Sequence, residues 1–369
     1  MQAVAAFTDT YLPTVNGVTY TVTTWRDRWR ARGGEMAVVY PRADGHAPAD
    51  GEHPVRSLPF PFYEGFRLGL PRVPRNLDGV DVVHVHTPFS MGVAGWRLAR
   101  RRDVPLVASY HTPTSEYVGY LTRRPAIERR LSAVSRAWER RFFDRASVVT
   151  APSEATRDHL VDAIGVATPV EVVPNGVDTD RFRPVDTDGF RARHDLDGDR
   201  PLVGYTGRHG HEKRLDVLVD AAAALDATVV LAGDGPARPE LERRAAALDA
   251  DVRFLGFLDR EALPAFYTAL DVFAFPSPVE TQGIVALEAM ACGTPVVGAD
   301  RGALAETVEA GVTGYHFAAG DPDDLAASVE RALADRERLV EGCRARRDQL
   351  DVAAAVDRLA DLYSSLRTG

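Results

Sequence analysis

The sequence is almost without lysine and has few cysteines. Its 44 lysine and arginine residues include a single lysine, Lys213, so the other 43 are arginine. The formal net charge of −9 argues against a general nucleic-acid-binding protein, because such proteins carry a basic domain. The two cysteines, Cys292 and Cys343, lie far apart and outside any CxxC spacing, which predicts neither a disulfide framework nor a zinc site.

Long hydrophobic runs are also missing. No stretch approaches the roughly 20 apolar residues of a membrane-spanning helix. The chain enters a strand-like run at residues 2–7 with no signal-peptide pattern before it. We therefore expect a cytoplasmic protein that at most binds the membrane periphery. A P-loop is excluded as well, because Glu212 and not glycine precedes the lysine.

Short apolar runs alternate with helical patterns along the chain, which predicts a parallel α/β architecture. A chain of 369 residues is too long for one compact core, and residues 174–200 interrupt the pattern with many Pro, Gly and Asp. We therefore predict two doubly wound Rossmann-like domains, over 1–176 and 201–350, with a linker over 177–200. A helix over 351–369 is expected to return to the N-terminal domain. The predicted strands are 3–7, 36–40, 80–86, 104–110, 147–151, 170–173, 201–207, 227–233, 252–257, 271–277 and 294–300.

In such sheets ligands bind outside the carboxyl ends of the strands, so functional residues are expected in the following loops, at a cleft between the domains. Arg208 and Lys213 lie five residues apart after the run that ends at Gly207. The loop between them can turn an arginine fork and a lysine ammonium toward one anion. His209 and His211 have no third ligand nearby and are not expected to bind a metal.

A second functional stretch is predicted at residues 275–297, where a helix begins near Gly283 after an acidic loop. The first N–H groups of that helix form an anion site, and the glycine lets a phosphate approach the backbone. Glu280 and Glu288 would be about 12 Å apart on one continuous helix, beyond the roughly 5–9.5 Å of a glycosidase pair. Two carboxylates beside a phosphate site suit the hydroxyls of a nucleotide sugar instead, Glu280 at the hexose and Glu288 at the ribose.

Three other patterns are not expected to form binding sites. Residues 233–238, GDGPAR, depart from a dinucleotide-binding fingerprint because Arg238 stands where its third glycine belongs. The DxD-like triplets between 178 and 199 lie in or beside the Asp-rich segment and are expected to be solvated. His84 and His86 point to one face of a strand and are expected to pack at its end rather than bind a ligand.

Together the motifs resemble the retaining glycosyltransferases of family 4, which have the GT-B fold. ETQGIVALE (280–288) fits the E-x7-E motif of that family. The sequence looks closest to the glycolipid glucosyltransferase and mannosyltransferase branches. The other segments that resemble family blocks, in family order, are FTDTYLPTVNGV (7–18), VVHVHTPF (82–89), SYHT (109–112), PSEAT (152–156), VPNGVD (173–178), GRHGHEK (207–213), LAGDGP (231–236), VRFLGFL (252–258), FAFPS (273–277), EAMACGTPVV (288–297) and GVTGYHF (311–317).

The resemblance implies roles for individual residues. Arg208 and Lys213 would hold the donor diphosphate, and Glu280 would bind the hydroxyls of the donor sugar. His111 looks like the family histidine close to that sugar. The chain departs from many relatives at Pro113-Thr114, on the acceptor side. The other implied donor-binding positions are Gln282, Gly283 and Ile284 near sugar and phosphate, Glu288 at the ribose, Phe257 and Leu258 at the base, and Gly17 in a phosphate-facing loop.

By that resemblance, the expected activity is transfer of a hexose from a nucleoside-diphosphate sugar to an acceptor hydroxyl, with retention. UDP-glucose is favoured as donor over GDP-mannose, and a glycerolipid or glycan is expected as acceptor. No metal cofactor is expected, because Arg208, Lys213 and the helix dipole would take the part that Mg²⁺ plays elsewhere. The alternatives are a nucleotide-sugar epimerase and a non-catalytic nucleotide-sugar-binding protein on the same fold.

Residues 123–145 are predicted to form an amphipathic helix with an apolar stripe and a basic face. One interpretation is a core helix whose basic face is solvated. The other is peripheral docking on anionic lipid, worth about 1 kcal/mol for each basic residue near such a surface, as in membrane-associated relatives. The stripe consists of Ile127, Leu131, Val134, Trp138 and Phe142, and Arg129, Arg136 and Arg140 lie opposite.

Overall fold

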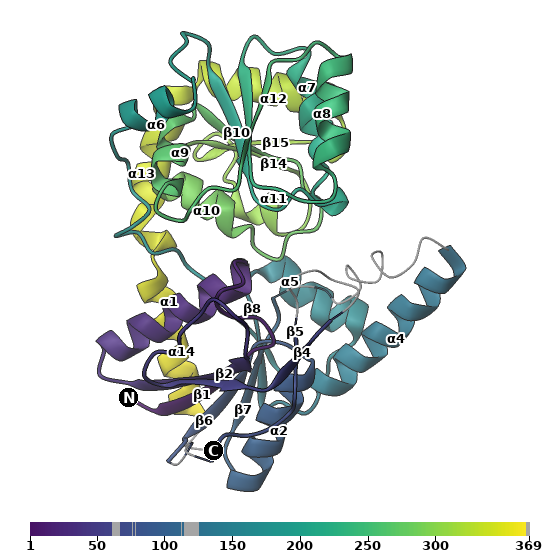
Figure 1. Ribbon diagram of the computed structural model, residues 1–369, viewed down its shortest axis with the longest axis vertical. Helices are drawn as coiled ribbons and strands as arrows, with labels where there is room; N and C mark the ends of the chain where they lie inside the picture. Colours follow the sequence, from purple (N-terminus) through teal and green to yellow (C-terminus); the bar gives the residue numbers. More distant parts are fainter. Residues whose placement is uncertain (61–66, 76, 78, 112, 114–124, 367–369) are drawn as a thin grey trace. The chain divides into compact units, whose positions relative to one another are not determined.

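The computed structural model describes residues 1–60, 67–75, 77, 79–111, 113 and 125–366 (Figure 1). The chain divides into two compact units. The first comprises Met1–Asn175 together with Val352–Gly369, and the second comprises Gly176–Asp351. Each unit is built on a parallel sheet with helices packed against it, which confirms the predicted α/β class with two Rossmann-like domains.

The described part of the first unit holds a seven-stranded sheet of order β3-β2-β1-β6-β7-β8-β9, and all its neighbouring strands run parallel. The strands β4 and β5, which follow β3 in the chain, form a separate small antiparallel pair. The strands are β1 (Ala3–Phe7), β2 (Glu35–Pro41), β3 (Glu52–Val55), β4 (Ser57–Pro59), β5 (Arg67–Gly69), β6 (Val82–Val85), β7 (Leu106–Ser109), β8 (Val148–Ala151) and β9 (Val170–Val172). The helices are α1 (Gly17–Ala31), α2 (Ser90–Arg102), α4 (Pro125–Phe143), α5 (Glu154–Asp158) with a π-helical turn at His159–Ile164, and α14 (Val352–Ser365).

Alternation along β1 places side chains on both faces of this sheet. Ala5 and Phe7 join a cluster that includes residues of α2 and α4, whereas Val4 and Ala6 join a cluster formed with α1 and α14. Successive side chains of a strand point to opposite faces, so a strand covered on both sides reads as one continuous apolar run. This is why AVAAF was recognisable as a strand from its sequence.

The helix α14 supplies part of the second face although it follows the whole second unit in the chain. Its Val356, Leu359 and Tyr363 are fully buried against residues of α1 and the sheet. The ring of Tyr363 meets that of Trp29 edge-on at 5.3 Å between centroids. The first unit is therefore completed by residues about 180 positions beyond its main segment.

The described part of the second unit holds a six-stranded parallel sheet of order β12-β11-β10-β13-β14-β15 around one continuous core. The strands are β10 (Leu202–Thr206), β11 (Thr228–Ala232), β12 (Val252–Gly256), β13 (Val272–Phe275), β14 (Val296–Ala299) and β15 (Gly314–Phe317). The helices are α6 (Asp188–Arg193), α7 (Leu215–Ala222), α8 (Arg238–Ala247), α9 (Leu263–Ala269), α10 (Ile284–Ala291), α11 (Ala303–Thr307), α12 (Pro322–Ala334) and α13 (Arg336–Leu350), with a 3₁₀ turn at His211–Lys213.

Residues 177–200 were expected to form a linker, but they pack as part of the second unit. The segment contains α6, and Phe182, Phe190 and Leu196 are buried in the core of that unit. Asp188 and Gly189 lie within α6 and Asp195 forms a turn, so this composition does not keep the apolar residues out of the core. The second unit accordingly starts at Gly176.

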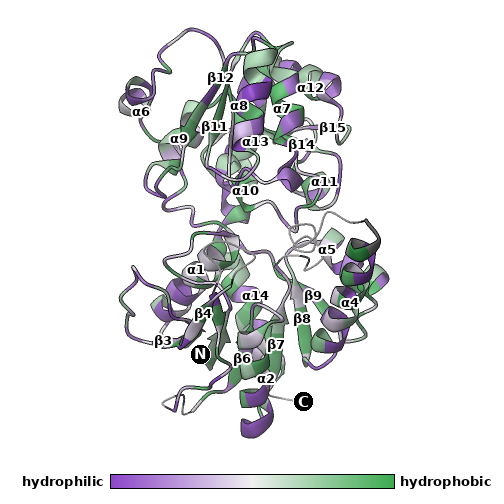
Figure 2. Cartoon of the chain, turned by 45° about the vertical axis from the view of Figure 1, so that its right-hand side comes forward, coloured by the Kyte–Doolittle hydropathy of each residue, from purple (hydrophilic) through white to green (hydrophobic). Residues whose placement is uncertain are grey.

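The helix α4 is not a core helix along most of its length, in contrast to one of the two interpretations of its sequence. Figure 2 shows both hydrophobic and hydrophilic residues along it. Phe142 is buried, as a core residue would be. The remaining four members of the apolar stripe are exposed: Ile127 by 41%, Leu131 by 37%, Val134 by 67% and Trp138 by 39%. Most of the stripe is therefore a surface and not a core contact.

Within the parts of the chain that the structure describes, no helix combines the length and apolarity needed to span a membrane.

We predict that Leu359→Ala lowers the free energy of unfolding by ~3 kcal/mol, because it leaves a cavity under α14. Chemical denaturation measures this loss. Arg358→Ala, on the exposed side of the same helix, is the matched control and is expected to change stability by less than about 0.5 kcal/mol. Equal stability of the two variants would show that α14 does not complete the first core.

Candidate active site

The order of strands in the second unit reverses at β10, which pairs with β11 on one side and β13 on the other. The loops after β10 and β13 therefore leave the sheet in opposite directions, and ligands of parallel α/β sheets bind at such reversal points. Arg208 and Lys213 lie on the loop after β10, and Glu280 lies on the loop after β13. The topology thus brings together three residues that are far apart in the sequence.

Two ion pairs involve the residues of these loops. The Lys213 Nζ donates to Oε1 of Glu280 over 2.7 Å and so joins the two loops. The Arg208 Nη2 donates to Oε1 of Glu212 over 2.5 Å within its own loop. All four side chains are partly exposed, so a ligand in solvent can reach them. The arrangement offers two cations to an anion and a carboxylate to neighbouring hydroxyls.

The loop that carries Arg208 rests on the backbone of the loop after β11. The Gly207 N–H donates to the Ala232 carbonyl over 3.1 Å, and the His209 N–H donates to the Asp234 carbonyl over 2.8 Å. A Cβ at Gly233 would collide with the Gly207 carbonyl oxygen, and both glycines adopt positive φ. Gly233 is therefore required because another backbone lies against the GDGP segment.

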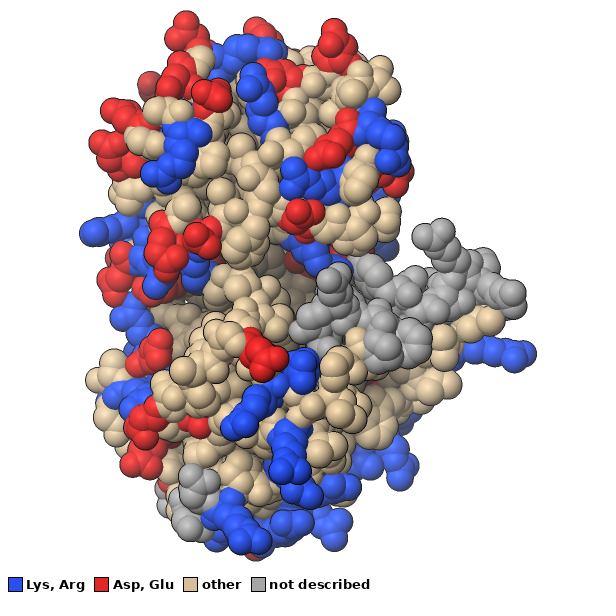
Figure 3. All heavy atoms as spheres, viewed as in Figure 1, with Lys and Arg blue, Asp and Glu red and all other residues tan. Residues whose placement is uncertain are grey.

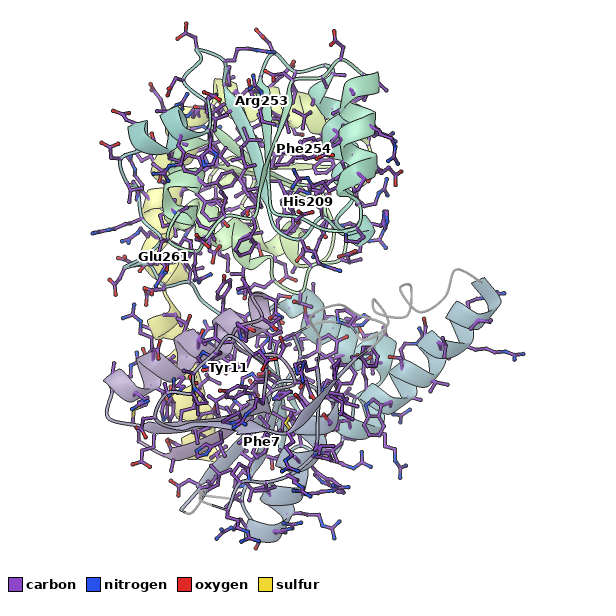
Figure 4. All side chains as sticks on the ribbon, in the orientation of Figure 1. Phe7, Tyr11, His209, Arg253, Phe254 and Glu261 are labelled. Carbon is purple, nitrogen blue, oxygen red and sulfur yellow. The ribbon has the colours of Figure 1, made fainter. Side chains whose placement is uncertain are left out.

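The His209 side chain faces inward and is fully buried. Its ring lies edge-on to Phe254 at 6.4 Å between centroids, and its Nε2 contacts the Ala232 carbonyl oxygen at 3.3 Å (Figure 4). Burial lowers the pKa of His209, which favours the neutral ring. Among the described side chains, no group of three His, Cys, Asp or Glu residues could hold a metal ion.

Gly283 begins α10 in the left-handed region at φ 78° and ψ 58°. A Cβ there would also meet Leu304 Cδ2 at 2.8 Å, so glycine is required by conformation and by space. The helix starts at Ile284, with its partly exposed first turn next to the loop. Glu280 precedes α10 and Glu288 lies within it, so the separation expected for two carboxylates on one continuous helix does not apply.

The other positions of the second unit that are predicted to bind the donor lie around α10 and at the end of β12. Gln282 is buried, and its carbonyl oxygen accepts a hydrogen bond from Thr307 Oγ1 over 2.9 Å. Phe257, just after β12, is 63% exposed, whereas Leu258 packs partly against the core. An exposed aromatic ring at the end of a parallel strand is suited to stacking on a planar ligand.

Glu288 is buried within α10, and its carboxylate already has two protein partners. The Tyr267 hydroxyl donates to Oε2 over 2.8 Å, and the Arg260 Nη1 donates to Oε1 over 3.3 Å. Burial raises the pKa of Glu288, and Arg260 and Tyr267 oppose that shift. The carboxylate is thus oriented by the protein before any ligand binds.

In the first unit, Gly17 is the first residue of α1 and is exposed. The preceding Asn16 caps the helix, since its Oδ1 accepts from the Thr19 N–H over 2.9 Å. Asn16 also donates through Nδ2 to Thr10 Oγ1 over 2.7 Å, which fixes the loop after β1. The cap and this hydrogen bond thus fix the loop at the start of α1, at the reversal point between β1 and β6.

His111, which follows β7, is partly exposed and stacks on His86 with ring centroids 5.3 Å apart. The Nδ1 of His86 and the Nε2 of His111 are 3.0 Å apart, so one of the two rings donates a hydrogen bond to the other. His84 and His86 are both buried, which confirms that they pack inside the strand end. Of the predicted departure at Pro113-Thr114, Thr114 lies outside the described residues.

His84 belongs to a hydrogen-bond chain that crosses the first unit. Its Nδ1 is 2.6 Å from the Tyr363 hydroxyl, and its Nε2 is 2.7 Å from Ser109 Oγ. Ser109 in turn contacts Thr150 at 2.7 Å. Burial lowers the pKa of His84 to about 3 and that of His111 to about 4, and the pKa of His86 is also well below its usual value.

Sequence reasoning missed the partners of the site residues. Arg260 lies in the loop after β12, and functional residues are expected in loops that follow parallel strands. This position could have marked Arg260 as a candidate. Tyr267 is a buried residue of α9 with no local signal at all. Glu212 directly precedes the lysine and was used only to exclude a P-loop. His86 was assigned to packing, and its contact with His111 depends on two strands meeting.

Two family models cover most of the chain. The model described as Glycosyltransferase Family 4 matches residues 15–181, and the model described as Glycosyl transferases group 1 matches residues 186–347. A GDP-mannose-dependent alpha-mannosyltransferase of Mycolicibacterium smegmatis is 34% identical over 360 residues, covering 94% of this chain and 92% of that protein. The chain therefore belongs to the family 4 glycosyltransferases.

Two further similarities agree with this assignment. The sulfoquinovosyl transferase SQD2 of Arabidopsis thaliana is 33% identical over 299 residues, which is 76% of this chain but 56% of that protein. Anabaena Alr3699/HepE, solved in complex with UDP and glucose, superposes with a TM-score of 0.79 at 24% identity over 98% of this chain and 100% of that one. The fold is accordingly the GT-B fold.

The buried histidines predict an acid-sensitive first unit. Their usual pKa is 6.5, and in the folded chain the pKa is about 3 for His84, about 4 for His111 and well below 6.5 for His86. Over this interval the unfolded chain binds protons that the folded chain does not. Stability is thus retained above pH 6.5 and falls as the pH drops, by up to ~1.4 kcal/mol per pH unit for each histidine. Urea titrations at pH 7.5, 6 and 5 measure the slope.

His84→Gln is expected to make this slope shallower by the contribution of one histidine, whatever it does to absolute stability. His211→Gln, at an exposed position, is the control and should leave the slope as it is. An unchanged slope in His84→Gln would contradict the assignment of the acid sensitivity to this cluster.

Proposed function

We propose that the protein is a retaining hexosyltransferase that takes its hexose from a nucleoside-diphosphate sugar. The observation that carries the proposal is the pair between Lys213 and Glu280, which places a cation and a carboxylate side by side at the reversal point of the second sheet. The lysine suits a diphosphate, and the carboxylate suits the hydroxyls of the attached sugar.

In this mechanism the role of the protein is mainly electrostatic. Cleavage of the bond between sugar and diphosphate leaves negative charge on the diphosphate, and Arg208, Lys213 and the start of α10 would stabilise it. The departing diphosphate oxygen would accept the proton of the incoming hydroxyl on the same face of the sugar. Transfer on one face gives retention without a covalent intermediate on the protein.

For the donor we propose GDP-mannose first and UDP-glucose second. The sequence alone favoured UDP-glucose, and the Anabaena protein that shares the fold was solved with UDP and glucose. The M. smegmatis relative matches nearly the full length of both chains and is GDP-mannose-dependent, which outweighs a likeness of fold. For the acceptor we propose a hydroxyl of a glycerolipid or a glycan.

The direct test is a panel of UDP- and GDP-sugars incubated with the protein and a lipid extract, with and without EDTA. We expect transfer from GDP-mannose, no loss of rate in EDTA, and a product with the anomeric configuration of the donor. Lys213→Ala should lower kcat by roughly 10²–10³, the cost of removing one donor to a developing oxyanion. Arg243→Ala, which removes an exposed arginine of the same unit, is the charge-matched control.

The outcomes separate the alternatives. Donor isomerised in the absence of acceptor would identify an epimerase, and donor bound without turnover would identify a non-catalytic binding protein. Turnover by Lys213→Ala at the parent rate would refute the diphosphate assignment. Loss of rate in EDTA would refute metal independence.

We also propose that the first unit contacts anionic membrane through α4. Its exposed apolar stripe would enter the lipid boundary while flanking arginines meet the headgroups. Figure 3 shows basic side chains gathered on this unit near the end of α2 and along α4. On α4, the exposed Arg130 and Arg141 lie beside the stripe, whereas Arg129, Arg136 and Arg140 lie opposite it. The exposed arginines of α2 are Arg100, Arg101 and Arg102.

Vesicle flotation tests this contact. The protein is expected to float with phosphatidylglycerol vesicles and not with phosphatidylcholine vesicles, and binding should weaken with salt. Val134→Asp should lower the vesicle-bound fraction about tenfold, because it places a charge in the stripe. Leu248→Asp, at a comparably exposed apolar position of the second unit, is the control. Equal flotation of both variants would show that α4 is not the contact.

A further inference from the structure

Glu212 has a role in the second unit that neither the family motif nor the sugar chemistry requires. It is the middle residue of the 3₁₀ turn His211–Lys213, between the two cations of the loop. Its carboxylate bonds Arg208 at 2.5 Å, and its side chain is only 17% exposed. A partly buried carboxylate on a cation has a larger effect on anion binding than a solvated one, because water screens it less.

The backbone is shaped to admit this carboxylate. A Cβ at Gly210 would collide with both carboxylate oxygens of Glu212. Gly210 lies at φ −88° and ψ 153°, a conformation that any residue adopts, so its glycine is not required by backbone strain. The space above Gly210 is thus occupied by the Glu212 carboxylate, which folds back toward Arg208.

The charges in the loop nearly cancel before any ligand arrives. Arg208 is matched by Glu212, and Lys213 is matched by Glu280. In the proposed reaction Glu280 turns to the sugar hydroxyls, whereas Glu212 has no such task. The departing diphosphate takes the proton of the acceptor hydroxyl, and it carries one more negative charge than in the donor once that proton has passed to solvent. An uncompensated pair of cations would therefore bind the product more tightly than the donor.

We propose that Glu212 is a positioning residue that holds the Arg208 guanidinium in place and, by its negative charge, weakens the grip of the loop on the nucleoside-diphosphate product. This inference rests on the proposed function for its biological meaning, but the underlying competition between a carboxylate and a diphosphate for Arg208 does not depend on the donor. Glu212 sets the rate at which the site is emptied.

The test is the affinity of Glu212→Gln for pyrophosphate, UDP and GDP by calorimetry, with kcat and product inhibition measured in parallel. Glutamine keeps an oxygen that can accept from Arg208 but removes the charge. We expect the Kd of pyrophosphate to fall about fivefold, equivalent to ~1 kcal/mol. Product inhibition should strengthen by a similar factor, and kcat should fall because release slows.

Glu240→Gln is the matched control, since it removes one exposed carboxylate from α8 of the same unit and should leave the Kd unchanged. Gly210→Ala should also separate Glu212 from Arg208, because the added Cβ displaces the Glu212 carboxylate. It too should tighten pyrophosphate binding, and the double variant should bind no more tightly than Glu212→Gln, because both changes remove one contact.

Unchanged or weaker pyrophosphate binding by Glu212→Gln would overturn the proposal, since a merely structural support of Arg208 predicts weaker binding. Full additivity of the two substitutions would overturn it as well. If no sugar nucleotide is turned over while the pyrophosphate effect holds, the proposed transfer reaction is wrong and the role of Glu212 stands. The two failures are therefore distinguishable.

Discussion

The close approach of two loop backbones is the constraint on which the second unit depends. The loop after β10 lies against the loop after β11 because Gly233 and Gly235 leave no side chain between them. That contact fixes the backbone of the loop on which Arg208 lies, and the pair between Lys213 and Glu280 then connects it to the loop after β13. The cations Arg208 and Lys213 lie on a loop, but these contacts hold that loop against the end of the sheet.

The strands and the family motifs were predictable because they depend on local sequence. Parallel strands buried on both faces read as uninterrupted apolar runs, and each predicted run contains a strand. The short strands β3, β4, β5 and β15 were not predicted. For β3 and β4 the reason is that EHPV and SLP combine charge or proline with few apolar residues. In the sheet β10 and β13 are neighbours, and this brings the loop of Lys213 next to the loop of Glu280.

What the sequence could not supply were contacts set by tertiary packing. The stripe on α4 has a helical period, but a period does not say whether another element covers it. The partners of Glu288 come from a loop and a neighbouring helix, and the partner of His111 comes from the adjacent strand. Such pairings depend on distances between elements that no local pattern encodes.

The return of α14 to the first unit has a consequence for synthesis of the chain. The second unit is one continuous segment, Gly176–Asp351, so it can fold while the ribosome is still adding residues. The first unit begins to emerge earlier but cannot bury Trp29 and Val22 fully until Tyr363 and Leu359 have been made. The first unit is therefore the last to complete its core, and until α14 has been made the buried face of α1 lacks part of its cover.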